Sequence, residues 1–449
     1  MIGAFPWDPF PPGEPDPKGP DPVHAVAYRA AVTAADAYHA VRLALRRESG
    51  TLRVGNRFVP DGRYREVGFL AAGNAANSMA LGALHALGDR LTQGFLAGPE
   101  PIPPELPFQG VTVPPGLPGT REAEEVVLAA HEIAAGLGAQ DLFLVLLSPG
   151  ALGALATPPP GLDPAGFRAL LTDAFARGAS GREIGLLARV LGRGAVGGRL
   201  PSLVPEADTT TLLVERGDGA AVLGGGPMRP IADADRAEVR AVVERIGLGG
   251  SWPAAAGKDA ASTPPPGDRF PRPVVVASPS DALRAASDAV FEKGWSVRLG
   301  FLEMHEPPDA AARRLLERSE ELLATERLGP ESRTKGVATF AMASLGLPEG
   351  VDEGPALATF LGVARSQLRR REGSVGLFRT GGDIGTPLAN PLPDGPLYPP
   401  GAVIGAPTDP EATVAPDRAR GLRMRRGITD VGCLALVLYP KPESRGTPA

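Results

Sequence analysis

The sequence predicts an α/β protein with two doubly wound domains and a cleft between them. Short, almost continuous apolar runs alternate with helix-length amphipathic segments over most of the chain. Such runs are typical of strands that are buried on both faces of a parallel sheet. The alternation stops in a stretch rich in proline and glycine at residues 249–272 and then begins again. We therefore expect a linker at 249–272 with one domain on each side of it.

The first domain is expected to span residues 21–248. Its first element is a long amphipathic helix at 22–48, which closes with arginines in the last turn and glycine after it, two signals of a helix end. Strands and helices then alternate. The expected strands are 66–72, 93–97, 110–113, 141–147 and 210–215, and the expected helices are 74–88, 120–137, 163–178 and 180–191.

The second domain is expected to span residues 273–449, where the same alternation returns. Its expected strands are 273–278, 295–302, 374–378 and 432–439, and its expected helices are 280–293, 307–325, 335–345 and 353–370. The stretches 99–109 and 385–411 are expected as loops. Residues 1–20 form a proline-rich N-terminal arm in which Phe5, Trp7 and Phe10 alternate with prolines. This arm either stays solvated or packs on the body or on a neighbour.

Composition narrows the classes of function. The chain has 449 residues, of which 43% are apolar, and a net charge of −5 with scattered basic residues, so we expect no nucleic-acid partner. No apolar run reaches the roughly 18 residues that cross a bilayer, and the N-terminus resembles no export signal. The single cysteine, Cys433, excludes an internal disulfide and a multi-cysteine metal site. We expect a cytoplasmic protein without a membrane partner.

Histidine does not form a metal-binding pattern. The five histidines have no His-x-x-x-His pair and fall mostly on expected helices; they are residues 24, 39, 85, 131 and 305. We interpret them as surface or packing residues. Gly192 to Gly197 spells a dinucleotide motif, but it follows a helix instead of a strand, so a dinucleotide site is not expected there.

The corner at Gly73-Asn74 has the strand-turn-helix arrangement that commonly binds phosphate through backbone N–H groups. A lysine or arginine would be expected there, whereas Asn74 can cap the helix and offer only a neutral donor. A second turn, Ser148-Pro149-Gly150, follows the strand at 141–147. Pro149 has no N–H to offer a phosphate. Both turns keep the shape of a phosphate site but lack its usual donors.

The order and spacing of these segments resemble the glycerate 2-kinase family with a MOFRL-type C-terminal domain, over roughly residues 22–440. The motifs that carry the resemblance are FLAAGNAANSM with Gly73, Ala75, Ala76 and Met79, DLFLVLLSPGALGAL at 141–155, Gly197-Gly198-Arg199-Leu200, and ITDVGCL at 428–434. The resemblance implies a Rossmann-like N-terminal sheet, a smaller MOFRL-like second domain and a ligand cleft between them. It also implies ATP- and Mg²⁺-dependent phosphoryl transfer to the 2-hydroxyl of glycerate.

The resemblance assigns roles to particular positions. The nucleotide side corresponds to Gly73, Asn74, Ser148, Gly150, Gly197, Gly198 and Arg199. In an active enzyme the catalytic residues would be Asp218, Arg189 and Asp383, with Asp218 the one metal ligand. Most charged residues of the family's motifs are replaced; the replacements are Asn74 for lysine, Pro115 for histidine, Leu152 for serine, and Val214 and Gly219 for aspartates.

These replacements favour a catalytically impaired relative with a binding or regulatory role. Phosphoryl transfer depends on positioning and on charge stabilisation, and losing one preorganised stabiliser costs about 3–4 kcal/mol. Such a protein needs no cofactor, and its partner would be a small hydroxy acid, another protein or a second copy of the chain. Two alternatives stay open. One is an active, divergent phosphotransferase that uses ATP and Mg²⁺, and the other is a structural or assembly subunit.

Overall fold

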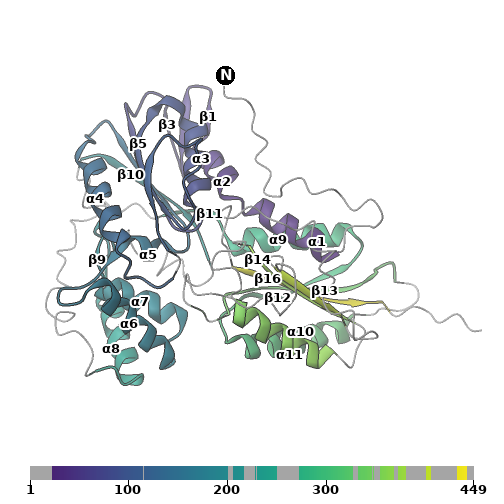
Figure 1. Ribbon diagram of the computed structural model, residues 1–449. Coiled ribbons are helices and arrows are strands. Elements are labelled where there is room, and N and C mark those ends of the chain that lie inside the picture. The colour runs from purple at the N-terminus through teal and green to yellow at the C-terminus, as the bar shows by residue number, and fades with distance from the viewer. Residues whose placement is uncertain are drawn as a thin grey trace, which may run out of the picture.

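The computed structural model describes most of the chain. The described residues are 23–114, 116–200, 206–216, 228, 230–249, 273–326, 332–345, 347, 354–368, 373–380, 401–405 and 432–441. The arm at 1–20 and all but the first residue of the linker at 249–272 lie outside them. The described elements form two lobes, each built on one large sheet (Figure 1). None of the described helices is long and apolar enough to cross a membrane.

The first lobe contains a six-stranded sheet in the order β11-β10-β7-β4-β5-β6, with every pair parallel. Its strands are β4 (Val67–Ala72), β5 (Leu91–Gly98), β6 (Gln109–Thr112), β7 (Leu142–Leu147), β10 (Asp208–Val214) and β11 (Val274–Ala277). Every residue of β4 and β7 is buried. The expected parallel sheet with strands covered on both faces is therefore confirmed.

Helices cover both faces of this sheet. Successive side chains of a strand point to opposite faces, so alternate residues of each strand belong to different cores. Leu142, Leu144 and Leu146 belong to the core that includes α2 (Ala37–Ala44) and α3 (Ala76–Leu87). Phe143, Val145 and Leu147 face the opposite core. The helices of that second core are α4 (Glu122–Ala135), α5 (Ala151–Leu155), α6 (Pro164–Ala176), α7 (Gly181–Leu191) and α8 (Asp233–Arg245).

Smaller elements complete this lobe. A three-stranded antiparallel sheet precedes β4 and consists of β1 (Arg47–Glu48), β2 (Thr51–Val54) and β3 (Arg57–Pro60). A short 3-10 helix, η1 (Gly88–Arg90), follows α3, and β8 (Ala156–Thr157) pairs with β9 (Arg193–Gly194).

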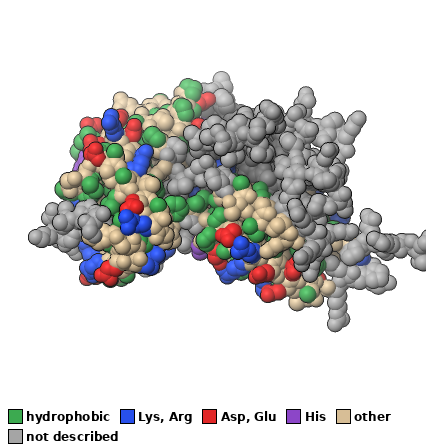
Figure 2. All heavy atoms as spheres, turned by 60° about the horizontal axis from the view of Figure 1, so that its bottom comes forward, with side chains coloured by type: hydrophobic (Ala, Val, Ile, Leu, Met, Phe, Trp, Pro, Cys, Tyr) green, Lys and Arg blue, Asp and Glu red, His purple; other side chains and the backbone are tan. Residues whose placement is uncertain are grey.

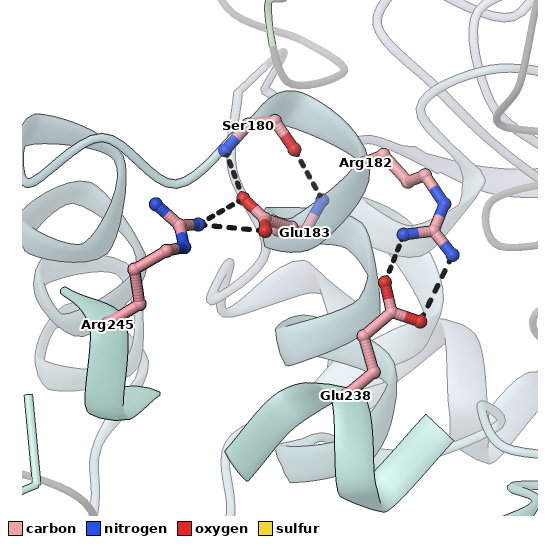
Figure 3. Close-up of polar contacts among 5 residues, drawn as sticks. All are labelled: Ser180, Arg182, Glu183, Glu238 and Arg245. Carbon is pink, nitrogen blue, oxygen red and sulfur yellow. Dashed lines mark hydrogen bonds and ion pairs between the residues drawn. The ribbon is translucent and has the colours of Figure 1, made fainter. Parts of the chain in front are cut away.

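Polar contacts define where α7 begins and join it to α8 (Figure 3). Ser180 Oγ accepts from the N–H of Glu183 at 3.3 Å, and Glu183 Oε2 accepts from the N–H of Ser180 at 2.7 Å. Arg245 of α8 donates to both carboxylate oxygens of Glu183, at 2.8 and 2.7 Å. Arg182 and Glu238 form a second ion pair between the helices. These pairs are partly exposed, so each adds at most about 1 kcal/mol of stability.

The second lobe contains a five-stranded sheet in the order β12-β13-β16-β14-β15. Its strands are β12 (Ser296–Met304), β13 (Gly336–Ala343), β14 (Ser374–Arg379), β15 (Gly401–Gly405) and β16 (Cys433–Pro440), and its helices are α9 (Pro279–Glu292), α10 (Pro308–Thr325) and α11 (Gly354–Leu368). Only β12 and β13 are parallel, and the other pairs are antiparallel. The sheet is therefore mixed, whereas a doubly wound sheet was expected.

Two local expectations in this lobe were wrong. Residues 335–345 were expected as a helix but form β13, whose eight residues are all buried. The run GVATFAMA contains no charged residue, so it shows neither a helical nor a strand period. Residues 385–411 were expected as a loop, yet Gly401–Gly405 forms the edge strand β15.

The N-terminal helix crosses from one lobe to the other. The expected helix at 22–48 is two helices, α1 (Val23–Ala34) and α2, because the Asp36 side chain accepts from the N–H of Tyr38 at 2.9 Å and starts α2. Helix α1 lies beside α9 over the second sheet (Figure 1). There Tyr28 donates to the carbonyl of Arg379 at 2.9 Å and stacks on Phe378.

The chain also crosses in the other direction. Residues 273–278 were expected to open the second domain, but β11 is the edge strand of the first sheet. The lobes therefore do not coincide with the ranges 21–248 and 273–449. One continuous core of buried residues extends from the first sheet through α1 and α9 to β13 and β16.

Candidate functional site

Backbone and side-chain hydrogen bonds join the two turns that were expected to bind phosphate. β4 and β7 are adjacent parallel strands, so Gly73 and Ser148 leave the sheet side by side. The N–H of Asn74 donates to the carbonyl of Pro149 at 2.7 Å. The N–H of Ala75 donates to Ser148 Oγ at 2.9 Å, and the buried Ser148 hydroxyl donates to the carbonyl of Ala72 at 3.3 Å. These contacts bring Gly73, Asn74 and Ser148 together.

Two glycines are required by the close approach of these turns. Gly73 has φ +107°, and a Cβ at this residue would lie 2.2 Å from the carbonyl oxygen of Ser148. Gly150 has φ +90°, and its Cβ would lie 2.8 Å from Oδ1 of Asn74. Both positions exclude other residues without any ligand being present.

Asn74 was expected to cap the helix that follows, α3, with its side chain. The N-cap of α3 is Ala75, and no side-chain hydrogen bond caps it. The expectation that Asn74 caps this helix was therefore wrong, because Asn74 lies one residue too early. The N–H of Ala76 donates to the carbonyl of Gly73 at 3.1 Å. The N–H groups of Asn74, Ala75 and Ala76 thus all donate to acceptors within the protein.

A small pocket lies beside this corner, at the carboxyl ends of β4 and β5. It contains about 290 Å³ of atom-free space, including its mouth. The lining residues are Gly73, Asn74, Ala97, Gly98, Pro99, Val113, Pro114, Gly116, Gly150, Gly153 and Ala154. None of these lining residues carries a charge, so the pocket offers one neutral amide and mostly apolar surface.

Other predicted site residues lie outside this lining. Gly197, Gly198 and Arg199 form the turn after β9. Arg199 donates to the carbonyl of Gly192 at 3.2 Å. Burial lowers the pKa of the Arg199 guanidinium, and the positive charge of Arg193 lowers it further. Two arginines are therefore close together here, away from the pocket beside Gly73.

Of the three predicted catalytic residues, Arg189 is the one that the structure describes, and it is buried. It is 1% exposed. Its Nη2 donates to the carbonyl of Pro230 at 2.8 Å and pairs with Asp235 at 3.1 Å. Asp235 also accepts from the N–H of Ala232 at 2.8 Å, at the start of α8. Arg189 thus joins α7 to α8.

The other two predicted catalytic residues, Asp218 and Asp383, lie outside the described residues. Asp218 was also the predicted metal ligand, so the structure does not describe that site. Within the described part of the chain, no group of three or more histidine, cysteine, aspartate or glutamate side chains is arranged to hold a metal ion.

A second cavity lies between the two lobes, where the sequence predicted a cleft, but its lining residues were not predicted as site residues. The carboxyl ends of β10, β12 and β13 meet there, and the lining residues are Arg216, Pro279, Glu303, His305, Met342, Ala343, Ser344 and Gly432. On the face shown in Figure 2 the described surface is hollowed between the lobes, and acidic and basic side chains are interspersed on both. The signal in the sequence is Glu303-Met304-His305 directly after the expected strand 295–302, where His305 was expected as a surface or packing residue.

Comparisons with known proteins agree with this fold. A family described as "Domain of unknown function (DUF4147)" matches residues 24–258. Glycerate kinase of Bos taurus is 31% identical over 202 residues, which cover 41% of this chain and only 38% of that protein's length.

Two solved structures share the fold over almost the whole chain. The PH0495 protein of Pyrococcus horikoshii OT3 has a TM-score of 0.65 at 15% identity, covering 94% of this chain and 98% of its own. Glycerate kinase of Thermotoga maritima has a TM-score of 0.64 at 18% identity, covering 93% and 98%. The chain therefore belongs to the DUF4147 family, and its similarity to glycerate kinases in sequence and in fold confirms the resemblance that its motifs carry.

Proposed function

We propose that this protein is a catalytically impaired relative of the glycerate kinases that acts as a binding or regulatory protein. The observation that supports this most directly is the closed corner after β4. The N–H groups of Asn74, Ala75 and Ala76 donate to protein acceptors, so a phosphate would have to displace those contacts. The cost of breaking them would oppose nucleotide binding.

The charge of the pocket supports the same proposal. Phosphoryl transfer spreads negative charge over the phosphate oxygens, and enzymes stabilise it with Lys, Arg and Mg²⁺. The pocket beside Gly73 is lined only by uncharged residues. Arg189, the one described arginine among the predicted catalytic residues, already pairs with Asp235. A small uncharged or weakly polar ligand therefore suits this pocket better than a nucleotide phosphate.

An assay of ADP release tests the proposal. The purified full-length protein is incubated with ATP, Mg²⁺ and a panel of 2-hydroxy acids headed by D-glycerate. Glycerate kinase of Thermotoga maritima serves as the positive control. We expect no turnover above background and no change in melting temperature with MgATP.

The opposite outcome would identify an active enzyme. Turnover that disappears in Asp218→Ala would mean that the protein is a divergent kinase of a small hydroxy acid that uses ATP and Mg²⁺. Arg189→Lys and Arg199→Lys would then separate the roles of the two arginines, because lysine keeps the charge but loses the planar donor geometry.

A further inference from the structure

The cavity between the lobes brings together three side chains that the proposed function does not use. β12 and β13 are adjacent and parallel, with Met304 opposite Ala343. The next residues, His305 and Ser344, therefore leave the sheet side by side. Glu303 precedes His305 by two positions, and the strand period of two places both on the same face. Sheet register thus assembles a carboxylate, an imidazole and a hydroxyl at one end of the sheet.

The contacts join a carboxylate, an imidazole and a hydroxyl in series, as in a nucleophilic triad, with the two imidazole nitrogens exchanged relative to the serine proteases. His305 Nε2 lies 3.3 Å from Glu303 Oε2, and His305 Nδ1 lies 3.2 Å from Ser344 Oγ. With the imidazole proton on Nε2 facing the carboxylate, Nδ1 can accept the proton of the Ser344 hydroxyl, which also has the carbonyl of Met304 as an acceptor at 3.4 Å. This is the arrangement in which a histidine acts as base toward a serine while an acid orients it. Distances slightly above 3.2 Å are common before substrate binds.

The surroundings of Ser344 fit this chemistry. Leu345 has φ +56°, a left-handed conformation that costs a non-glycine residue about 1–3 kcal/mol. The backbone therefore turns sharply immediately after Ser344. Arg216, at the carboxyl end of β10, lines the same cavity. Its charge can stabilise an oxygen that becomes negative during attack on a carbonyl.

Two further acidic residues lie near Glu303. Burial raises the pKa of Glu215, and the nearby charges of Glu303 and Asp281 raise it further. The cavity contains about 190 Å³ of atom-free space, including its mouth. Little of this space is enclosed, so only a small group can enter it.

We propose that Ser344, His305 and Glu303 form an esterase site for esters of small carboxylic acids. Ser344 Oγ attacks the carbonyl carbon and its proton passes to His305 Nδ1, while Arg216 stabilises the carbonyl oxygen. The bond to the alcohol oxygen breaks, and the alcohol leaves with the proton from His305. Water then attacks the acyl group on Ser344 and gives a proton to His305. The carboxylic acid leaves, and that proton returns to Ser344.

Covalent labelling tests the nucleophile. Full-length protein is treated with a fluorophosphonate, which forms an adduct with an activated serine, and its intact mass is measured. We expect one adduct that maps to Ser344 and is absent in Ser344→Ala. Ser366→Ala is the matched control, since Ser366 is an exposed serine on α11 whose hydroxyl donates to the carbonyl of Val363. A folded protein that takes no label, or equal labelling of Ser344→Ala, would overturn the proposal.

Hydrolysis of p-nitrophenyl acetate tests the positioning role of Glu303. We expect Glu303→Gln to lower kcat by roughly 10²–10⁴ with little change in KM, because it replaces the carboxylate that orients His305 with a neutral amide that can also donate. Glu303→Asp should recover part of the rate, and p-nitrophenyl octanoate should be a poorer substrate. An unchanged kcat in Glu303→Gln would refute this role. The ester assay contains no nucleotide, so its outcome is independent of the test for kinase activity.

Discussion

At the scale of single residues, the corner after β4 shows that packing alone can require the glycines of a phosphate-loop pattern. Gly73 and Gly150 suit a phosphate loop, yet the packing of the two turns against each other already requires both glycines. The same contacts occupy the N–H groups of Asn74 and Ala75. A glycine pattern in a sequence therefore identifies the shape of this corner and leaves open what the corner binds.

Gly73→Ala is expected to destabilise the protein by roughly 3 kcal/mol, because it adds a steric clash to an unfavourable φ. The new Cβ would lie 2.2 Å from the carbonyl oxygen of Ser148. Gly178→Ala is the matched control, since Gly178 has φ +92° but open space around its Cβ position. It should lose only about 1 kcal/mol. Urea denaturation of both variants measures the difference, and equal losses would mean that the turns are not tightly packed.

Arg189→Ala is expected to cost roughly 3–5 kcal/mol of stability, because it leaves Asp235 without its buried partner. Arg177→Ala provides the comparison. Arg177 forms an exposed pair with Asp173 one helical turn away, and losing it should cost about 0.5 kcal/mol or less. Thermal denaturation compares the two. If Arg189→Ala were as stable as Arg177→Ala, the contact between α7 and α8 would not depend on this ion pair.

At the scale of elements, α1 is the segment whose position depends most on partners far away in the chain. Asp36 starts a new helix, α2, so the expected helix is broken between Ala34 and Ala37. The part before the break, α1, packs on the second sheet instead of the first. His24 in α1 is buried, and its Nε2 lies 2.9 Å from Ser374 Oγ in β14. This contact places a titratable group in the junction between α1 and β14.

Burial of His24 makes the stability of this junction depend on pH. Burial lowers the pKa of His24 to about 3, from an ordinary value of 6.5. The folded protein keeps His24 neutral, whereas the unfolded chain takes up a proton below pH 6.5. Stability is therefore lost as pH falls from 6.5 toward 3, by about 2 kcal/mol between pH 7 and pH 5.

His24→Gln should remove this part of the pH dependence, and His131→Gln, which changes an exposed histidine on α4, should keep it. Urea denaturation at pH 7 and at pH 5 measures the change. If the His24 variant lost as much stability as the parent protein over this interval, other groups would account for the dependence.

At the scale of the whole molecule, the two lobes share a core. The buried cluster includes Leu144 of the first sheet, Ala31 of α1, Leu283 of α9, and Phe340 and Leu436 of the second sheet. An interface built from a continuous apolar core resists independent movement of its two sides. We therefore expect the lobes to unfold together.

Hydrogen exchange measured by mass spectrometry tests this expectation. The amides of β4 and β13 should exchange with the same free energy of opening, because opening either sheet exposes the shared core. The amides of α8, which lies outside this core, provide a reference for local opening. Exchange of β13 while β4 stays protected would mean that the second lobe opens by itself.

The local sequence identified the elements that are buried on both faces. VGFLAA and LFLVLL are apolar throughout, and this was enough to predict β4 and β7 in a parallel sheet with a turn after each. The helix expected at 180–191 corresponds to α7, whose start the structure shows to be a capping box of Ser180 and Glu183. Most elements of the first lobe follow from such local patterns.

Tertiary structure decided which elements meet. Nothing local in GVATFAMA distinguishes a strand from a helix, and only its pairing with β12 and β16 makes it β13. The crossing of α1, the membership of β11 in the first sheet, and the contact between His305 and Ser344 likewise depend on partners that are distant in the chain. The physical reason is that side-chain periodicity records how much of a segment is buried, whereas the identity of its partner depends on sheet register and packing.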